Sequence, residues 1–174
     1  MRRVKDDVTL WSLLGRETIG PPECPLLDRL TVVKHRRIGG LLLHRFYPNA
    51  DDRNVHDHPW WFMTLVLRGG YDDMKQCRQC EGSGRFYDEV DFYACPRCKG
   101  EGVIMRERMR AGMLRFRPAL HAHRTQVSSS GCVTLVLTGP TVREWGFYLG
   151  SSWQQWRSYI RQHGEAHRCD EEFV

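Results

Sequence analysis

The sequence predicts a mainly β domain, a sandwich or a barrel, and three observations lead to this fold class. Seven short segments rich in Val, Leu and aromatic residues have the length and composition of strands. Turn residues such as Gly39-Gly40 and Gly139-Pro140 separate them. Helical periodicity is confined to the two ends of the chain. The strands are expected at residues 30–35, 41–47, 60–67, 113–116, 124–127, 132–137 and 142–149.

The N-terminal part is expected to hold one short helix. Residues 8–15 place Val8, Trp11 and Leu14 where a helix would pack them onto the body. Three prolines follow and prevent regular structure until about residue 28. The first central strand, 60–67, is apolar at both parities, which predicts burial on both of its faces.

The C-terminal part is expected to form a second flanking helix. Trp153, Trp156 and Ile160 recur at helical spacing, Ser151 or Ser152 can cap the start, and Gly164 can end it. The expected organisation is an N-terminal extension at 1–27, a β-barrel at 28–150, an inserted cysteine module at 75–103, and a C-terminal helix and tail at 151–174.

Composition excludes several classes of protein. At 174 residues the chain can bury a core, and its 41% hydrophobic and 27% charged residues are ordinary for a globular domain. No apolar run reaches the roughly 18 residues of a membrane span. The net charge of +5 comes from scattered Lys and Arg, which does not indicate nucleic-acid binding. Charged residues follow the start where a signal peptide would be apolar, so a cytoplasmic location is expected.

The cysteine module contains a duplicated motif. CRQCEGSG begins at Cys77 and CPRCKGEG begins at Cys95, so each half reads CxxCxGxG. A two-residue gap lets both thiolates of a pair reach one ion, and the glycines allow a tight turn. Four soft ligands favour tetrahedral Zn²⁺ in a closed, structural site. The predicted zinc ligands are Cys77, Cys80, Cys95 and Cys98.

The motif resembles the zinc-binding repeats of DnaJ-type chaperones. The resemblance covers only residues 77–102, with fewer repeats than the chaperone domain, and no J-domain accompanies it. It therefore implies zinc binding and not chaperone activity. A contact of this module with a protein or a nucleic acid is left open.

Two His-x-His pairs form a second constellation. His56 and His58 lie two residues apart, and in a strand both would project from one face. His121 and His123 stand in the same relation near the start of a later strand. Neutral imidazole is a common ligand for Zn, Fe, Ni and Cu, so the pairs can converge on a metal.

At these residues the sequence resembles the cupin superfamily, and more narrowly a group of small uncharacterised single-domain cupins. The first cupin motif is matched by His56, His58 and the stretch from Trp60 to Gly69-Gly70-Tyr71, and the second by Pro118 and His123. LHRF, HDHPWWF, LVLRGGY, RPALHAHR, TLVLTGP and REWGF carry the narrower likeness, over roughly residues 28–157. The resemblance implies a double-stranded β-helix (jelly roll) with metal ligands at His56, His58 and His123.

One departure from the cupin pattern matters. Phe62 and Met63 stand where the first motif usually has a Glu, so a three-histidine site is expected. Fewer protein ligands leave more positions open for substrate or water, which permits Lewis-acid, water-activating or O₂ chemistry. His121 is expected to be a fourth ligand or a proton shuttle.

Other polar residues are candidates for catalysis or substrate binding. Arg115 and Arg117 share a strand face and can hold an anionic substrate, or they can be solvated outer charges. Arg143 and Glu144 are neighbours on a strand, so only one can face the cavity. The remaining candidates are Asp57, which would orient a loop or an imidazole, and Trp60, which would wall an apolar pocket.

Three hypotheses of function follow. The first is a metalloenzyme acting on a small, perhaps anionic, substrate. Fe²⁺ at the histidines would support a dioxygenase, and a redox-inert ion such as Zn²⁺ would support isomerase or hydrolytic chemistry. The second is a non-catalytic cupin that binds a ligand or partner. The third is a protein in which both metals serve folding only. A homodimer is left open.

Overall fold

The computed structural model describes residues 11–52, 54–87, 91–164 and 167–168, and it confirms the mainly β fold. Within these ranges the chain forms strands and one short helix. The elements are β1 (Trp11–Ile19), β2 (Leu27–His35), β3 (Gly39–Phe46), β4 (Asp51–Asp52), β5 (Phe62–Gln76), β6 (Arg85–Tyr87), β7 (Phe92–Ala94), β8 (Val103–Arg110), β9 (Leu114–Arg117), β10 (Arg124–Thr138), β11 (Gly146–Leu149), β12 (Ser152–Gln155), α1 (Trp156–His163) and β13 (His167–Arg168).

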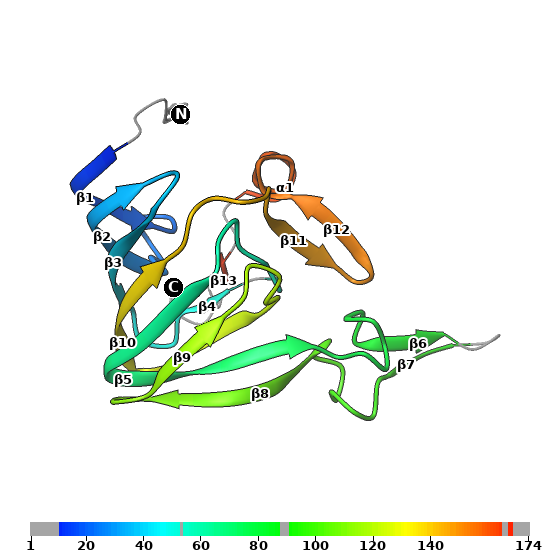
Figure 1. The fold of residues 1–174 in the computed structure, drawn as a ribbon. Coiled ribbons are helices and arrows are strands. Elements are labelled where there is room, and N and C mark those ends of the chain that lie inside the picture. The colour runs from blue at the N-terminus through cyan, green and yellow to red at the C-terminus, as the bar shows by residue number, and fades with distance from the viewer. Residues whose placement is uncertain (1–10, 53, 88–90, 165–166, 169–174) are drawn as a thin grey trace.

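Two long antiparallel strands, β5 and β10, organise the sandwich (Figure 1). One half of β10 continues the order β1-β2-β3-β10, and its other half pairs with β4. Similarly, the first half of β5 pairs with β9 and the second half with β8. Both strands bend as a pair, so each contributes to both layers of the sandwich. One layer contains β1, β2, β3 and β9, and the other contains β4 and β8.

The bend in β5 reverses which residues face inward. Gly69 has a φ of 70°, and a Cβ there would lie 1.9 Å from the carbonyl oxygen of Gly131, so only glycine fits. The β5–β10 register shifts beside this point. Val66, before the bend, and Asp73, after it, are both 1% exposed although their parities differ. A bulge therefore turns Asp73 into the interior.

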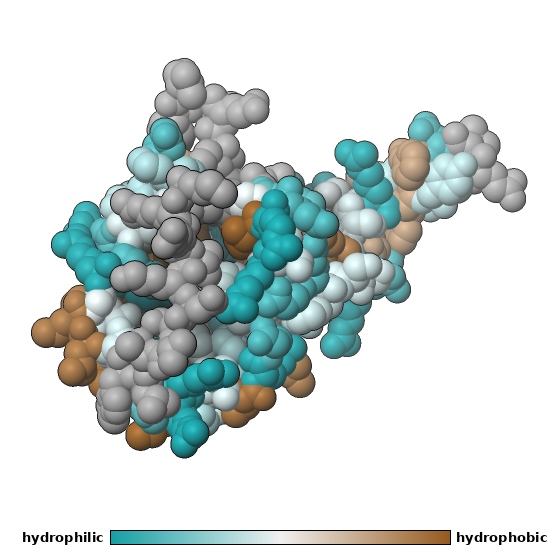
Figure 2. All heavy atoms as spheres, turned by 90° about the horizontal axis from the view of Figure 1, so that it is seen from above, coloured by the Kyte–Doolittle hydropathy of each residue, from teal (hydrophilic) through white to brown (hydrophobic). Residues whose placement is uncertain are grey.

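The outward face of the β9–β5–β10 part of the sheet is also apolar. Leu67, Leu114, Phe116 and Leu137 are between 41% and 57% exposed. The space-filling view shows hydrophobic side chains open to solvent on the body (Figure 2). The expectation that residues 60–67 are buried on both faces is therefore wrong, because Leu67 is 48% exposed. In this strand, apolar residues occupy both the face toward the interior and the face toward solvent.

The helix predicted over residues 8–15 is wrong where the structure describes it. Residues 11–19 form β1, which pairs along its length with the neighbouring β2. Leu13 and Leu14 are 67% and 75% exposed, so they do not pack on the body as a helix would have placed them. Hydrogen bonds to the open edge of β2 outweigh the weak local preference for a helix. Val8 lies outside the described residues.

The C-terminal helix is confirmed but begins later than expected. Residues 152–155 form β12, and the side chain of Gln155, rather than Ser151 or Ser152, accepts hydrogen bonds from the first turn of α1. Gly164 ends the helix with a φ of 73°. The predicted strands at 124–127 and 132–137 are parts of the single β10.

The cysteine module projects from the sandwich at the ends of β5 and β8. Figure 1 shows it as an arm that ends in the β6–β7 hairpin, and Figure 2 shows the same projection from above. Its buried cluster consists of the four cysteines, against which Phe86 and Ile104 pack. No helix within the described ranges is long and apolar enough to cross a membrane.

Candidate metal centre and cavity

Backbone pairing brings the two histidine motifs together. His56 and His123 form an antiparallel bridge in which each backbone N–H donates to the other carbonyl, at 2.8 and 2.9 Å. The N–H of His58 donates to the carbonyl of Ala119 at 3.1 Å. The segment around His56 and His58 therefore behaves as an extended strand, and both rings face the same side.

His56, His58 and His123, here called the histidine centre, form a compact triangle. Their ring centroids lie 5.0, 5.1 and 5.1 Å apart. The Nε2 atoms of His58 and His123 are 2.9 Å apart. Two nitrogens that bind one ion at about 2.05 Å and at right angles also lie about 2.9 Å apart. One ligand atom from each ring fits within 4.8 Å of the others, so the three residues suit a shared metal ion.

Burial keeps two of these imidazoles neutral. It lowers the pKa of His58 well below the ordinary value, and the neighbouring histidines lower it further. Burial also lowers the pKa of His123, although the nearby carboxylate of Asp73 opposes this effect. A neutral imidazole is the form that binds a metal.

Asp73 supports the histidine centre from behind and was missed by the sequence analysis. Its Oδ1 lies 3.6 Å from Nδ1 of His123, and its Oδ2 lies 3.0 Å from Nε2 of His121. Burial alone would raise the pKa of Asp73, but its hydrogen bond to His121 and its attraction to both histidines outweigh burial and hold the pKa below its usual range. Carboxylates commonly orient metal-binding imidazoles in this way. The only sequence signal would have been an acidic residue in a strand that continues past Gly69.

His121 lies beside the centre and not within it. It forms a second cluster with Asp73 and His123, and ligand atoms of this cluster also lie within 4.8 Å of one another. However, Nη1 of Arg106 is 2.7 Å from His121, and Nη2 of Arg117 is 3.0 Å from Asp73. Two guanidinium groups disfavour a cation at this second position. The structure therefore favours the first cluster.

Arg115 and Arg117 lie on the inward face of β9, in register with Thr64 and Phe62, but they do not line the cavity. Arg115 forms an ion pair with Glu107 at 2.6 Å, and Arg117 bridges Glu107 and Asp73. Neither belongs to the described residues that line the cavity, and their expected contact with a substrate stays a prediction. The carboxylates that pair with them come from two other strands, Asp73 from β5 and Glu107 from β8.

Asp57 fixes the loop between the two histidines of the first motif. It is fully buried, and its Oδ1 accepts a hydrogen bond from the backbone of Gly146 at 2.8 Å. Its Oδ2 lies 2.7 Å from Nη1 of Arg143 and accepts from the indole of Trp153. Arg143 is thus held on the far side of the loop from the rings.

Of the two remaining candidates, one lines the cavity and the other does not. Glu144 accepts a hydrogen bond from Gln155 at 3.1 Å and is absent from the described lining of the cavity. Trp60 does line the cavity, and Nζ of Lys34 lies 4.5 Å from the centre of its ring. Catalytic roles for Arg143 and Glu144 therefore find no geometric support.

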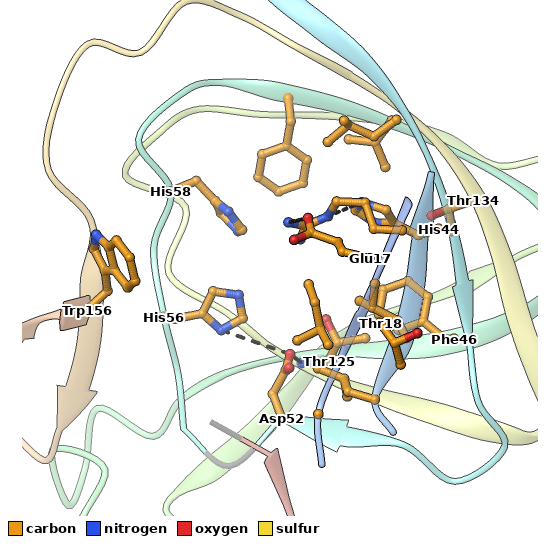
Figure 3. Close-up of a pocket in the computed structure, with 18 of the residues that line it drawn as sticks. Glu17, Thr18, His44, Phe46, Asp52, His56, His58, Thr125, Thr134 and Trp156 are labelled. Atoms are coloured by element: carbon orange, nitrogen blue, oxygen red, sulfur yellow. Dashed lines mark hydrogen bonds and ion pairs between the residues drawn. The ribbon is translucent and has the colours of Figure 1, made fainter. Parts of the chain in front are cut away.

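A large cavity opens beside the histidine centre (Figure 3). Its volume is about 1670 Å³, and apolar side chains form most of its wall. The ring of Phe62 lies 4.5 Å from that of His58 and makes this part of the wall apolar. Figure 3 shows His56 and His58 on one wall, and Glu17 and His44 facing them across the cavity. The lining also includes Leu27, Leu42, Phe46, Tyr71, Val136, Trp145, Phe147 and Trp156.

The four cysteines of the module converge as their spacing predicts. The sulfur of Cys77 lies 3.9 Å from that of Cys95, and the sulfur of Cys80 lies 3.7 Å from that of Cys98. Four sulfurs around one tetrahedral ion at about 2.3 Å would be about 3.8 Å apart. Backbone N–H groups of Gly82 and Glu101 close the two turns onto Cys77 and Cys98. The cluster can hold a metal ion, and its sulfur-only donor set suits zinc.

Comparison with known proteins supports the architecture. No protein-family model and no curated protein matches this sequence. Among solved structures, the polyketide cyclase RemF from Streptomyces resistomycificus is similar with a TM-score of 0.51 at 15% identity, over 94% of this chain and 95% of that one. The fold is a cupin-like β-sandwich. At this level of identity the likeness concerns the fold alone.

Two other solved structures are similar at lower scores. One is an RmlC-like cupin from Shewanella frigidimarina, with a TM-score of 0.47 and 16% identity over 73% of this chain and 84% of that one. The other is an uncharacterised protein with a double-stranded β-helix domain from Klebsiella pneumoniae, with a TM-score of 0.48 and 12% identity over 76% and 91% of the two chains.

Proposed function

We propose that this protein is a metal-dependent enzyme that acts on a small molecule in the sandwich cavity. The observation that carries the proposal is the triangle of imidazoles at the cavity wall, with His58 and His123 only 2.9 Å apart at Nε2. His56, His58 and His123 would hold a divalent ion. When bound, that ion would supply Lewis-acid or, if it is iron, redox chemistry to a substrate oxygen.

The protein's own residues would position the reaction and exclude water. The carboxylate of Asp73, 3.6 Å from Nδ1 of His123, would orient this ring so that its Nε2 faces the centre. Phe62 packs against His58 on the same wall and offers no acid or base. Burial raises the pKa of Tyr71 far above its usual value, so this lining residue remains a neutral phenol. Isomerase-like or dioxygenase-like chemistry fits such a site.

A non-catalytic binding protein is the second candidate. The observation that favours it is the apolar ring of Phe62 beside His58, because Phe62 and Met63 stand where the cupin motif that the sequence resembles has its Glu. Asp52 is an acidic residue of the lining, and its Oδ2 lies 4.0 Å from Nδ1 of His56. This oxygen already accepts a hydrogen bond from the backbone N–H of Thr125 at 2.9 Å, so it does not replace the missing carboxylate. In that case the cavity would hold a ligand, and the cysteine module would serve stability or contact a partner.

Elemental analysis of protein purified without added metal tests the proposal. We expect about one zinc per chain from the cysteine module together with a second divalent metal from the histidine centre. Iron as the second metal would favour dioxygenase chemistry, whereas a second zinc would favour isomerase or hydrolytic chemistry. Zinc at one equivalent and nothing else would contradict the enzyme proposal and favour the binding protein.

Replacing Asp73 with Asn should weaken metal binding at the histidine centre without removing any of the three ligands. The amide would keep the size of the side chain but lose the charge that orients His123, and such supporting carboxylates typically change metal affinity by about 10- to 100-fold. Competition with a chelator, followed by metal analysis, would measure the change. Asp72→Asn is the matched control, because Asp72 faces the other way and pairs with Arg108 at 2.7 Å. Equal metal affinity in the Asp73→Asn and Asp72→Asn proteins would show that Asp73 does not support the histidine centre.

A further inference from the structure

A row of three polar side chains crosses the cavity wall that faces the histidine centre. Glu17 on β1, Arg29 on β2 and His44 on β3 are direct cross-strand neighbours. Nη1 of Arg29 donates to Glu17 at 3.1 Å, and Nε donates to Nε2 of His44 at 3.1 Å. We call these three residues the polar row.

The polar row lies in apolar surroundings. All three residues line the cavity, and in Figure 3 Glu17 and His44 lie opposite His56 and His58. The neighbouring positions on β2 and β3 are Leu27, Leu42 and Phe46. A charged group on the inward face of a sheet costs stability unless it is paired or serves function. Glu17 is itself 57% exposed and pairs with only part of the guanidinium.

The protonation states make this row a donor surface. Burial lowers the pKa of His44 well below its ordinary value, and the charge of Arg29 lowers it further, so His44 is neutral. Its Nε2 accepts from Arg29, so the proton of the ring is on Nδ1. Burial also lowers the pKa of Arg29, but a guanidinium remains charged at neutral pH. Within the described part of the chain, Nη2 of Arg29 has no hydrogen-bond acceptor.

We propose that Arg29 binds the carboxylate of an organic acid whose apolar body fills the cavity toward the histidine centre. A guanidinium edge matches a carboxylate in shape and charge. One arginine beside a neutral histidine suits a monoanion better than a phosphate dianion. The other arginine of the lining, Arg16, has a side chain 74% exposed and lies at the rim. The assignment of this acid as a substrate rests on the proposed function, but its binding does not.

Binding of 2-naphthoate, compared with its neutral isostere 2-naphthamide by isothermal titration calorimetry, tests the proposal. Wild-type protein should prefer the acid by about tenfold or more, the effect of one hydrogen bond to a charged group. Arg29→Met should abolish the preference. Glu17→Gln removes the competing carboxylate and should raise the affinity for 2-naphthoate several-fold. Arg45→Met is the control, because Arg45 is exposed on the opposite face of β3 and lies over Tyr47.

Three outcomes would overturn the proposal. They are no saturable binding of 2-naphthoate or octanoate at millimolar concentration, equal affinity of wild-type protein for acid and amide, or a preference that survives Arg29→Met. If Arg29→Met fails to fold by circular dichroism, an unchanged affinity in Glu17→Gln overturns it. Repeating the titration with His58→Ala shows whether a metal at the histidine centre takes part in binding the acid. If Arg29 holds the carboxylate, this variant should still prefer the acid to the amide. Absence of a metal at the histidine centre of wild-type protein would contradict the proposed function. The comparison of 2-naphthoate with 2-naphthamide would still test the role of Arg29.

Discussion

Replacing Cys95 with Ser is expected to release the zinc and unfold the cysteine module while the sandwich stays folded. Among the described residues, the module buries little besides its cysteines, with Phe86 and Ile104 as the partly buried hydrophobic residues against them. Its folding must therefore come mainly from the metal, and structural zinc contributes about 10–16 kcal/mol of apparent binding free energy at neutral pH. Zinc content, together with limited proteolysis within residues 77–102, measures the effect.

A matched control separates this effect from loss of a buried thiol. Cys132 is buried in β10 outside the module, and burial raises the pKa of its thiol to about 11, so it behaves as a small core residue. Cys132→Ser should keep the zinc and the protease resistance of the module. Removal of residues 77–98 should also leave the strand circular dichroism in place, because the sandwich pairs around the base of the module. A zinc-free module that still resists protease would contradict the prediction.

Replacing His58 with Ala is expected to abolish metal binding at the histidine centre and leave the cysteine-bound zinc unchanged. His58 supplies one of three imidazoles, and removal of one leaves too few protein ligands to hold an ion against solvent. Metal content by elemental analysis, expressed per chain, measures the loss. The cysteine zinc in the same sample is an internal standard.

His121→Asn distinguishes the two overlapping clusters. Because His121 belongs only to the cluster with Asp73 and His123, this variant should keep the barrel metal if His56, His58 and His123 are the ligands. The reverse result, metal lost with His121→Asn and kept with His58→Ala, would move the site to Asp73, His121 and His123. Circular dichroism of both variants checks that the sandwich is intact.

Local spacing determined what the sequence could predict. The two CxxC motifs close around one point because a two-residue gap and glycine turns bring each pair of sulfurs together without long-range contacts. The same holds for His56 and His58, which share a face as soon as their segment is extended. The strand-rich class followed from composition and turns. The second His-x-His pair was a candidate from its spacing, and the resemblance to cupins selected His123 rather than His121 as the third ligand.

Tertiary structure decided the rest. β1 is a strand because β2 offers it an open edge, which no local pattern along residues 11–19 reveals. Asp73 reaches His123 because the bulge at Gly69 reverses the parity of β5. Glu17, Arg29 and His44 meet because three strands align in register. Each of these contacts depends on pairing between residues distant in the chain, whereas sequence patterns report only on what neighbouring residues can do.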